Sequence, residues 1–247
     1  MIKLGQFLFR YRDTVSTAIF LVVLLLSTPM HLGGDPGLDA WMDVAGSLVV
    51  LLGLGVRAIT IGYEYIVRGG RNKQVFADNL VQRGVYAHTR NPMYLGNGLI
   101  ALGLILIINA PEFYLIAIPL TVVVYASIIA AEEAYLRDKF GAAFNDYCAR
   151  VNRILPRLSG FRQSIEGMRF NWRRVLVKDY STIFLSIMGT LALCFWDDYR
   201  ILGAGALPPV EVGLMIFVPW AVLYFIVWRL KKTRRLEGDR SEPRGAG

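Results

Sequence analysis

Long apolar runs constrain this chain more than any other feature of its sequence. A membrane-spanning helix needs about 20 apolar residues to cross roughly 30 Å of hydrocarbon. Four runs reach that length and two are marginal, the third and fifth being short enough to tilt or re-enter. The runs lie at about residues 14–32, 41–62, 94–109, 112–131, 180–195 and 212–228. With 55% hydrophobic residues overall, the sequence predicts an all-α integral membrane protein with about six transmembrane helices.

Basic residues fall almost entirely on one side of the predicted helices. Of the 27 Lys and Arg residues, 25 precede the first run, separate the second from the third or the fourth from the fifth, or follow the sixth. The opposite loops carry mainly Asp and Glu. The positive-inside rule therefore predicts a multi-pass protein of the inner or plasma membrane with both termini and both long loops in the cytoplasm.

The net charge of +8 needs no nucleic acid to explain it. Cytoplasmic Lys and Arg beside anionic headgroups account for the excess, so we expect membrane lipids and no nucleic acid as partners. His31 and His88 are the two histidines and are predicted on opposite sides of the membrane, which argues against a metal site.

The runs also suggest a division of the chain. Residues 1–158 form a predicted core of four spans, and residues 159–236 add a basic connector and a transmembrane hairpin. We expect the connector, residues 159–179, to form an interfacial helix on the inner leaflet. The hairpin serves either packing or oligomerisation, which leaves the oligomeric state open. Residues 237–247 are predicted to be a disordered tail.

Two polar motifs flank the third and fourth runs. The first is Arg83-Gly84-Val85-Tyr86, followed by Arg90-Asn91-Pro92-Met93-Tyr94-Leu95-Gly96. The second is Glu132-Glu133, followed by Phe140-Gly141, Tyr147 and a basic run that ends at Pro156. Polar groups this dense at the ends of membrane helices indicate a functional site there.

The order of these motifs resembles the isoprenylcysteine carboxyl methyltransferase and phospholipid methyltransferase superfamily, over roughly the middle third of the chain. The resemblance implies an integral membrane enzyme that uses S-adenosyl-L-methionine from a cytoplasmic-side pocket and releases S-adenosyl-L-homocysteine. It also implies a lipid-like acceptor that enters from the bilayer: a prenylcysteine-type carboxylate, a phospholipid headgroup amine or another membrane-soluble nucleophile.

The resemblance further implies which residues form the site. Arg90 and Glu132 are the catalytic candidates. The implied cofactor-binding residues are Gly84, Val85, Tyr86, Arg90, Asn91, Tyr94, Gly96, Glu132, Glu133, Tyr147 and Arg153; the residues of the first turn would edge the adenosine through their backbone groups.

Several of these residues have a plainer alternative. Asn91 and Pro92 also suit the first turn of a helix, and Arg90 alone would be an interfacial cation. Many family members have His where this chain has Asn91, and an amide cannot act as a general base. Arg90 would pair with the cofactor carboxylate or with Glu132, and Gly96 also suits simple helix packing.

The adjacent glutamates differ in their local partners. Glu133 has Arg137 four residues later in the favourable orientation, and a surface ion pair between them is the plain alternative to a cofactor contact. Glu132 lacks such a partner, so we expect it to hold the cofactor's ammonium group. Within residues 135–147, apolar and aromatic side chains recur at steps of three and four residues. This pattern predicts an amphipathic helix that serves either as a lid over the site or as an interfacial anchor. Arg57 inside the second run is a snorkelling cation, a structural partner of Glu64 or, with Glu64, part of the substrate path.

Two rival functions remain. Membrane sterol reductases share an Arg-x-Pro-x-Tyr core but are much longer and bind NADPH. A non-enzymatic scaffold would leave the ordered motifs unexplained.

Overall fold

The computed structural model describes residues 2–27, 36–64, 77, 79–202 and 210–233, and these are helices and connecting segments without strands. The six long helices are α1 (Ile2–Leu26), α2 (Pro36–Tyr63), α3 (Pro92–Ile108), α4 (Ile118–Phe140), α7 (Trp172–Leu202) and α8 (Val210–Lys232). The shorter elements are the 3-10 helix η3 (Gly84–Ala87), the π-helical turn η4 (Phe113–Ala117), α5 (Ala142–Arg150) and α6 (Phe161–Ser164).

The all-α membrane architecture is confirmed, but the count of six spans is not. In the described part of the chain, four helical stretches are long and apolar enough to cross a bilayer: Gly37–Tyr63, Phe113–Phe140, Trp172–Trp196 and Glu211–Lys232. Thr17–Leu26 and Pro92–Ile108 are shorter apolar helices. The expectation of a short fifth span is wrong, because α7 begins at Trp172 and includes basic residues that the sequence suggested were connector.

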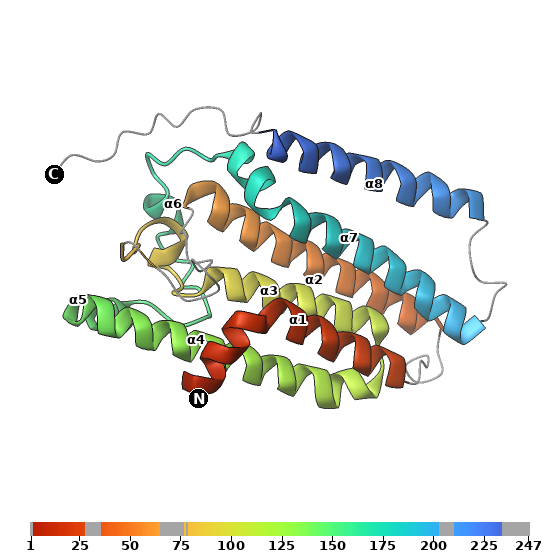
Figure 1. Cartoon of the computed structure of the whole chain (residues 1–247), viewed down its shortest axis with the longest axis horizontal. Helices are drawn as coiled ribbons and strands as arrows, with labels where there is room; N and C mark the ends of the chain where they lie inside the picture. The colour runs from red at the N-terminus through yellow and green to blue at the C-terminus, as the bar shows by residue number, and fades with distance from the viewer. Residues whose placement is uncertain (1, 28–35, 65–76, 78, 203–209, 234–247) are drawn as a thin grey trace.

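The long helices run roughly along a common direction (Figure 1). α2 packs along α3, α1 along α4, and α7 covers α2 and α3, while α8 lies at the edge against α7. The end of α2, the start of α3, the end of α4, and α5 and α6 gather at one end of the bundle (left in Figure 1). That end carries both polar motifs, so we call it the motif end.

Opposed glycines bring α2 and α3 into backbone contact. A Cβ placed on Gly46 would lie 2.6 Å from the carbonyl oxygen of Gly103, and one on Gly103 would lie 2.5 Å from that of Gly46. About two turns further along α2, a Cβ on Gly53 would lie 2.7 Å from the carbonyl oxygen of Gly96. Because small residues allow such close approach in membranes, these glycines set the α2–α3 distance.

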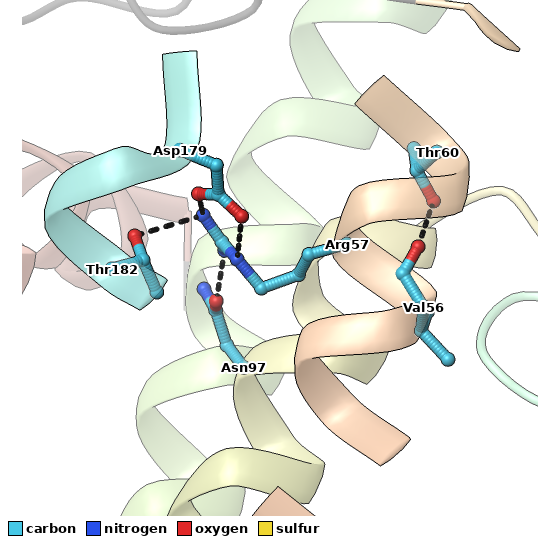
Figure 2. A network of polar contacts seen from close by, with 6 residues as sticks. All are labelled: Val56, Arg57, Thr60, Asn97, Asp179 and Thr182. Atoms are coloured by element: carbon cyan, nitrogen blue, oxygen red, sulfur yellow. Dashed lines mark hydrogen bonds and ion pairs between the residues drawn. The ribbon is translucent and has the colours of Figure 1, made fainter. Parts of the chain in front are cut away.

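Arg57 joins three helices inside the bundle (Figure 2). Its Nε donates to Asp179 Oδ2 of α7 at 3.0 Å, and its Nη2 donates to Asp179 Oδ1 and to Thr182. Its Nη1 donates to Asn97 of α3. The suggested pairing of Arg57 with Glu64 is wrong, because Glu64 accepts hydrogen bonds from Arg83 instead.

Two predicted interfacial helices are also corrected. Residues 159–179 contain only the single turn α6 before α7 starts, since glycines at 160 and 167 have positive φ values of 76° and 75°. The amphipathic pattern of residues 135–147 is divided between α4 and α5 by Gly141, whose φ is 54°. Its apolar side chains still share one buried cluster, which includes Leu136, Phe144 and Tyr147. The predicted tail, residues 237–247, lies outside the described residues.

We predict that Gly103→Ala destabilises the protein by about 1–3 kcal/mol, because the added methyl group overpacks the α2–α3 contact. The matched control is Gly98→Ala on the same helix, where a Cβ meets no atom within 4 Å. That change should be neutral or stabilising by up to about 1 kcal/mol, the helix preference of Ala over Gly. Thermal unfolding in detergent measures both, and equal losses would contradict the glycine contact.

We predict that Asp179→Leu costs about 3–5 kcal/mol, because it leaves a buried guanidinium without its anion. The double variant Arg57→Met/Asp179→Leu should cost less than this single change. Arg83→Gln is the control, since its side chain is 77% exposed and such pairs contribute about 0–1 kcal/mol. Unfolding in denaturant tests the ranking; an Asp179→Leu effect no larger than the control's would disprove the role of the pair.

Candidate active site

The segment that leads into α3 is held by the segment that follows α5. The Arg90 N–H donates to the carbonyl oxygen of Asn152 at 2.9 Å, and the Arg157 N–H donates to that of His88 at 3.1 Å. Two stretches more than 60 residues apart in sequence thus run side by side at the motif end.

Side chains of the first motif reinforce this contact. Thr89 Oγ1 donates to the carbonyl oxygen of Ile154 at 2.7 Å, and Asn91 Nδ2 donates to that of Arg153 at 3.0 Å. Asn91 stands at the start of α3 before Pro92, but its side chain makes no capping bond there. Its amide instead fixes the backbone that carries Arg153.

The Glu133 carboxylate gathers residues from three segments. Its Oε2 lies 2.9 Å from Nη2 of Arg153, and its Oε1 lies 3.5 Å from Nη2 of Arg90. The Glu133 residue is only 8% exposed. Among the described residues, no group donates a hydrogen bond to Oε1, so a buried carboxylate oxygen is left with an open position.

These groups line a pocket of about 430 Å³. Its walls bear one carboxylate and three guanidinium groups, and α1 contributes an apolar side chain. The lining residues are Ile2, Arg90, Ala130, Glu133, Ala134, Arg137 and Arg153. The pocket is therefore cationic overall, with a single anionic point.

The α4 part of the wall is one helical face. Ala130, Glu133, Ala134 and Arg137 stand at positions i, i+3, i+4 and i+7 and so share one face of the helix. The alanines leave space beside the carboxylate. The suggested ion pair of Glu133 with Arg137 is wrong: Arg137 donates to Asn145 of α5, while Glu133 turns to Arg90 and Arg153.

The start of α1 reaches the pocket because Gly5 lies against α4. A Cβ on Gly5 would stand 2.0 Å from the carbonyl oxygen of Ser127 and 2.8 Å from Ala131. This contact brings Ile2, three residues earlier, over the wall formed by α4.

Glu132 is not among the residues that line the pocket. It is 3% exposed and accepts a hydrogen bond from the Tyr94 hydroxyl at 2.6 Å. Two predicted site residues are thus brought together, Tyr94 from α3 and Glu132 from α4. Their bond fixes the start of α3 to the end of α4, one residue from the pocket carboxylate.

The remaining predicted site residues are not among those that line the pocket. A Cβ on Gly96 would stand 2.5 Å from Cγ of Arg57, so this glycine makes room for the three-helix ion pair. Gly84, Val85 and Tyr86 are buried in η3, and the Tyr147 hydroxyl donates to the carbonyl oxygen of Tyr86 at 2.7 Å. Their assignment to the cofactor stays a prediction.

Sequence reasoning missed Arg137 and Ile2 as pocket residues. For Arg137 the signal was present in the sequence. Arg137 lies four residues after Glu133, on the helical face that also carries the small residues Ala130 and Ala134. For Ile2 no local signal exists, since only the packing of α1 on α4 places it there.

One family of known proteins matches the middle of this chain. Residues 41–143 match the family model for phospholipid methyltransferases, which confirms the resemblance that the motifs predicted. The match runs from α2 to the start of α5 and includes Arg90 and both glutamates, but neither Arg153 nor α7.

One curated relative is the nickel-cobalt-cadmium resistance protein NccN of Alcaligenes xylosoxydans xylosoxydans. It is 29% identical over 161 residues, which cover 64% of this chain and 71% of the relative. No solved structure matches the chain. Within the described ranges, no three His, Cys, Asp or Glu residues lie together as a metal site would require.

Proposed function

We propose that this chain, with its phospholipid methyltransferase segment at residues 41–143, is an S-adenosyl-L-methionine-dependent methyltransferase acting on a membrane-embedded, lipid-like acceptor. The acceptor classes are a prenylcysteine-type carboxylate and a phospholipid headgroup amine. Each is a nucleophile attached to an apolar chain that a bilayer retains.

The observation that carries the proposal is the open position on Glu133 beside three arginines. The amino-acid part of the cofactor is a zwitterion, and the pocket offers complementary charges for both of its ends. Glu133 Oε1, which accepts no hydrogen bond from the described residues, would receive the ammonium group. Arg90 and Arg153, already beside that carboxylate, would receive the cofactor carboxylate.

The pocket volume also supports this fit. Small-molecule sites commonly enclose about 300–1,000 Å³, and the pocket holds about 430 Å³. Ala130 and Ala134 keep the α4 wall open, and the described part of α1 contributes only Ile2 to the lining. The position of the adenosine along η3 is part of the proposal.

When bound, the cofactor supplies a methyl group that its sulfonium already activates. The chain has mainly to align donor and acceptor and to balance the changing charge. Arg90 and Glu133 would orient the cofactor by direct contact. Tyr94 and Glu132 would keep α3 and α4 in register around it, which is a positioning role in place of the ammonium contact expected for Glu132.

We predict that the purified protein binds S-adenosyl-L-methionine and S-adenosyl-L-homocysteine, as measured by calorimetry in detergent. Both ligands carry the zwitterion that the pocket complements. Labelled NADPH should neither bind nor displace them, which separates this function from that of a reductase. No heat at millimolar ligand in folded protein, or binding of NADPH alone, would overturn the proposal.

We predict that Glu133→Gln weakens cofactor binding by at least about tenfold, because losing a charge partner costs about 2–5 kcal/mol and a decade of affinity is about 1.4 kcal/mol. Glu132→Gln is the matched control, since its amide oxygen still accepts the Tyr94 hydrogen bond. It should change affinity much less. The reverse ranking would return the ammonium contact to Glu132, and two negligible effects would remove both glutamates from the site.

A further inference from the structure

Residues 152–171 form a segment, here called the strap, that is tied at both ends to membrane helices. At its first end, backbone and side-chain bonds join residues 152–157 to residues 88–91, directly before α3. At its last end, the Asn171 N–H donates to the carbonyl oxygen of Gly62 in α2 at 2.9 Å. The strap is thus tethered beside the start of α3 and the end of α2.

The middle of the strap is also fixed. The two ring nitrogens of His88 contact Ser164 Oγ at 2.8 Å and the carbonyl oxygen of Arg157. The ring of Phe170 packs on Gly62, where a Cβ would stand 2.2 Å from its Cε2. The backbone of the strap, which carries the exposed side chains, is therefore fixed to the helices by these contacts.

These displayed side chains are apolar and basic. Leu155 is 75% exposed, Leu158 is 76% exposed, and Trp172, next to the strap, is 70% exposed. Arg157, Arg162 and Arg169 are exposed among them, and Glu166 is the one carboxylate in the strap. Leucine and tryptophan beside arginine is the composition of surfaces that lie in the headgroup layer, where each basic group is attracted to anionic lipid.

We propose that the strap is a docking surface for the anionic headgroups of the leaflet at the motif end, with Leu155 and Leu158 inserted among the acyl chains. Charge complementarity selects this partner, because a leaflet of zero net charge lacks the negative surface potential that attracts the exposed arginines. The inference is independent of methyl transfer. It concerns a different set of side chains from those that line the pocket. Arg153 is the one described residue that lies in the strap and also lines the pocket.

The test places a fluorescent nitrobenzoxadiazole label at Leu158→Cys in the full chain with its two native cysteines replaced by alanine. The protein is reconstituted in nanodiscs of phosphatidylcholine and phosphatidylglycerol. The label should be protected from soluble iodide and quenched by doxyl-labelled lipid. A label at Asp146→Cys, exposed on α5, is the matched control and should be quenched by iodide.

The anionic preference is read by comparing doxyl-phosphatidylglycerol with doxyl-phosphatidylcholine at equal mole fraction. Quenching at position 158 should favour the anionic lipid severalfold, and the triple change Arg157→Gln/Arg162→Gln/Arg169→Gln should bring the ratio to about one, as should molar salt. Leu155→Cys repeats the measurement should the first labelled variant fail to fold, as judged by thermal unfolding.

Each other outcome overturns the inference. Iodide access at position 158 equal to that at position 146 would place the strap in water. Protection from both iodide and lipid would mean that protein, such as a second copy of the chain, covers it. Equal quenching by the two lipids would remove the anionic headgroup as the partner.

Discussion

The buried guanidinium of Arg57 is the interaction on which the bundle's arrangement most depends. A charged group within a bilayer is costly unless its donors are satisfied, and Arg57 meets this demand with Asp179, Asn97 and Thr182. These partners come from α3 and α7, while Arg57 belongs to α2. The three helices can therefore pack in only a narrow range of registers, and α7 is tied to the core across the predicted boundary at residue 158.

Short contacts connect α3 to the residues of the candidate site. Gly96 leaves room for the Arg57 side chain, and Tyr94, two residues earlier, donates to Glu132 of α4. Glu132 adjoins Glu133, whose carboxylate meets Arg90 at the entry to α3. A structural ion pair and a pocket ion pair are thus connected through neighbouring residues of one segment of α3.

The strap gives the site its remaining wall. Thr89 and Asn91 use their side chains to hold its backbone, and that backbone presents Arg153 to Glu133. The first motif therefore contacts the second largely through hydrogen bonds from its side chains to main-chain carbonyl groups. This arrangement explains why an amide at position 91 suffices: the hydrogen bond needs a donor and no titratable ring.

The sequence by itself determined the all-helical membrane architecture, because apolar length and the placement of charge are local properties. It also determined that Arg90 and the two glutamates lie at one end, since motif order sets the ends of helices. Only the tertiary structure decided that Glu133, not Glu132, lines the pocket, because adjacent residues differ by about 100° and helix rotation follows from packing. It likewise decided that Arg57 pairs with Asp179, 122 residues away, where no local spacing could reveal the partner.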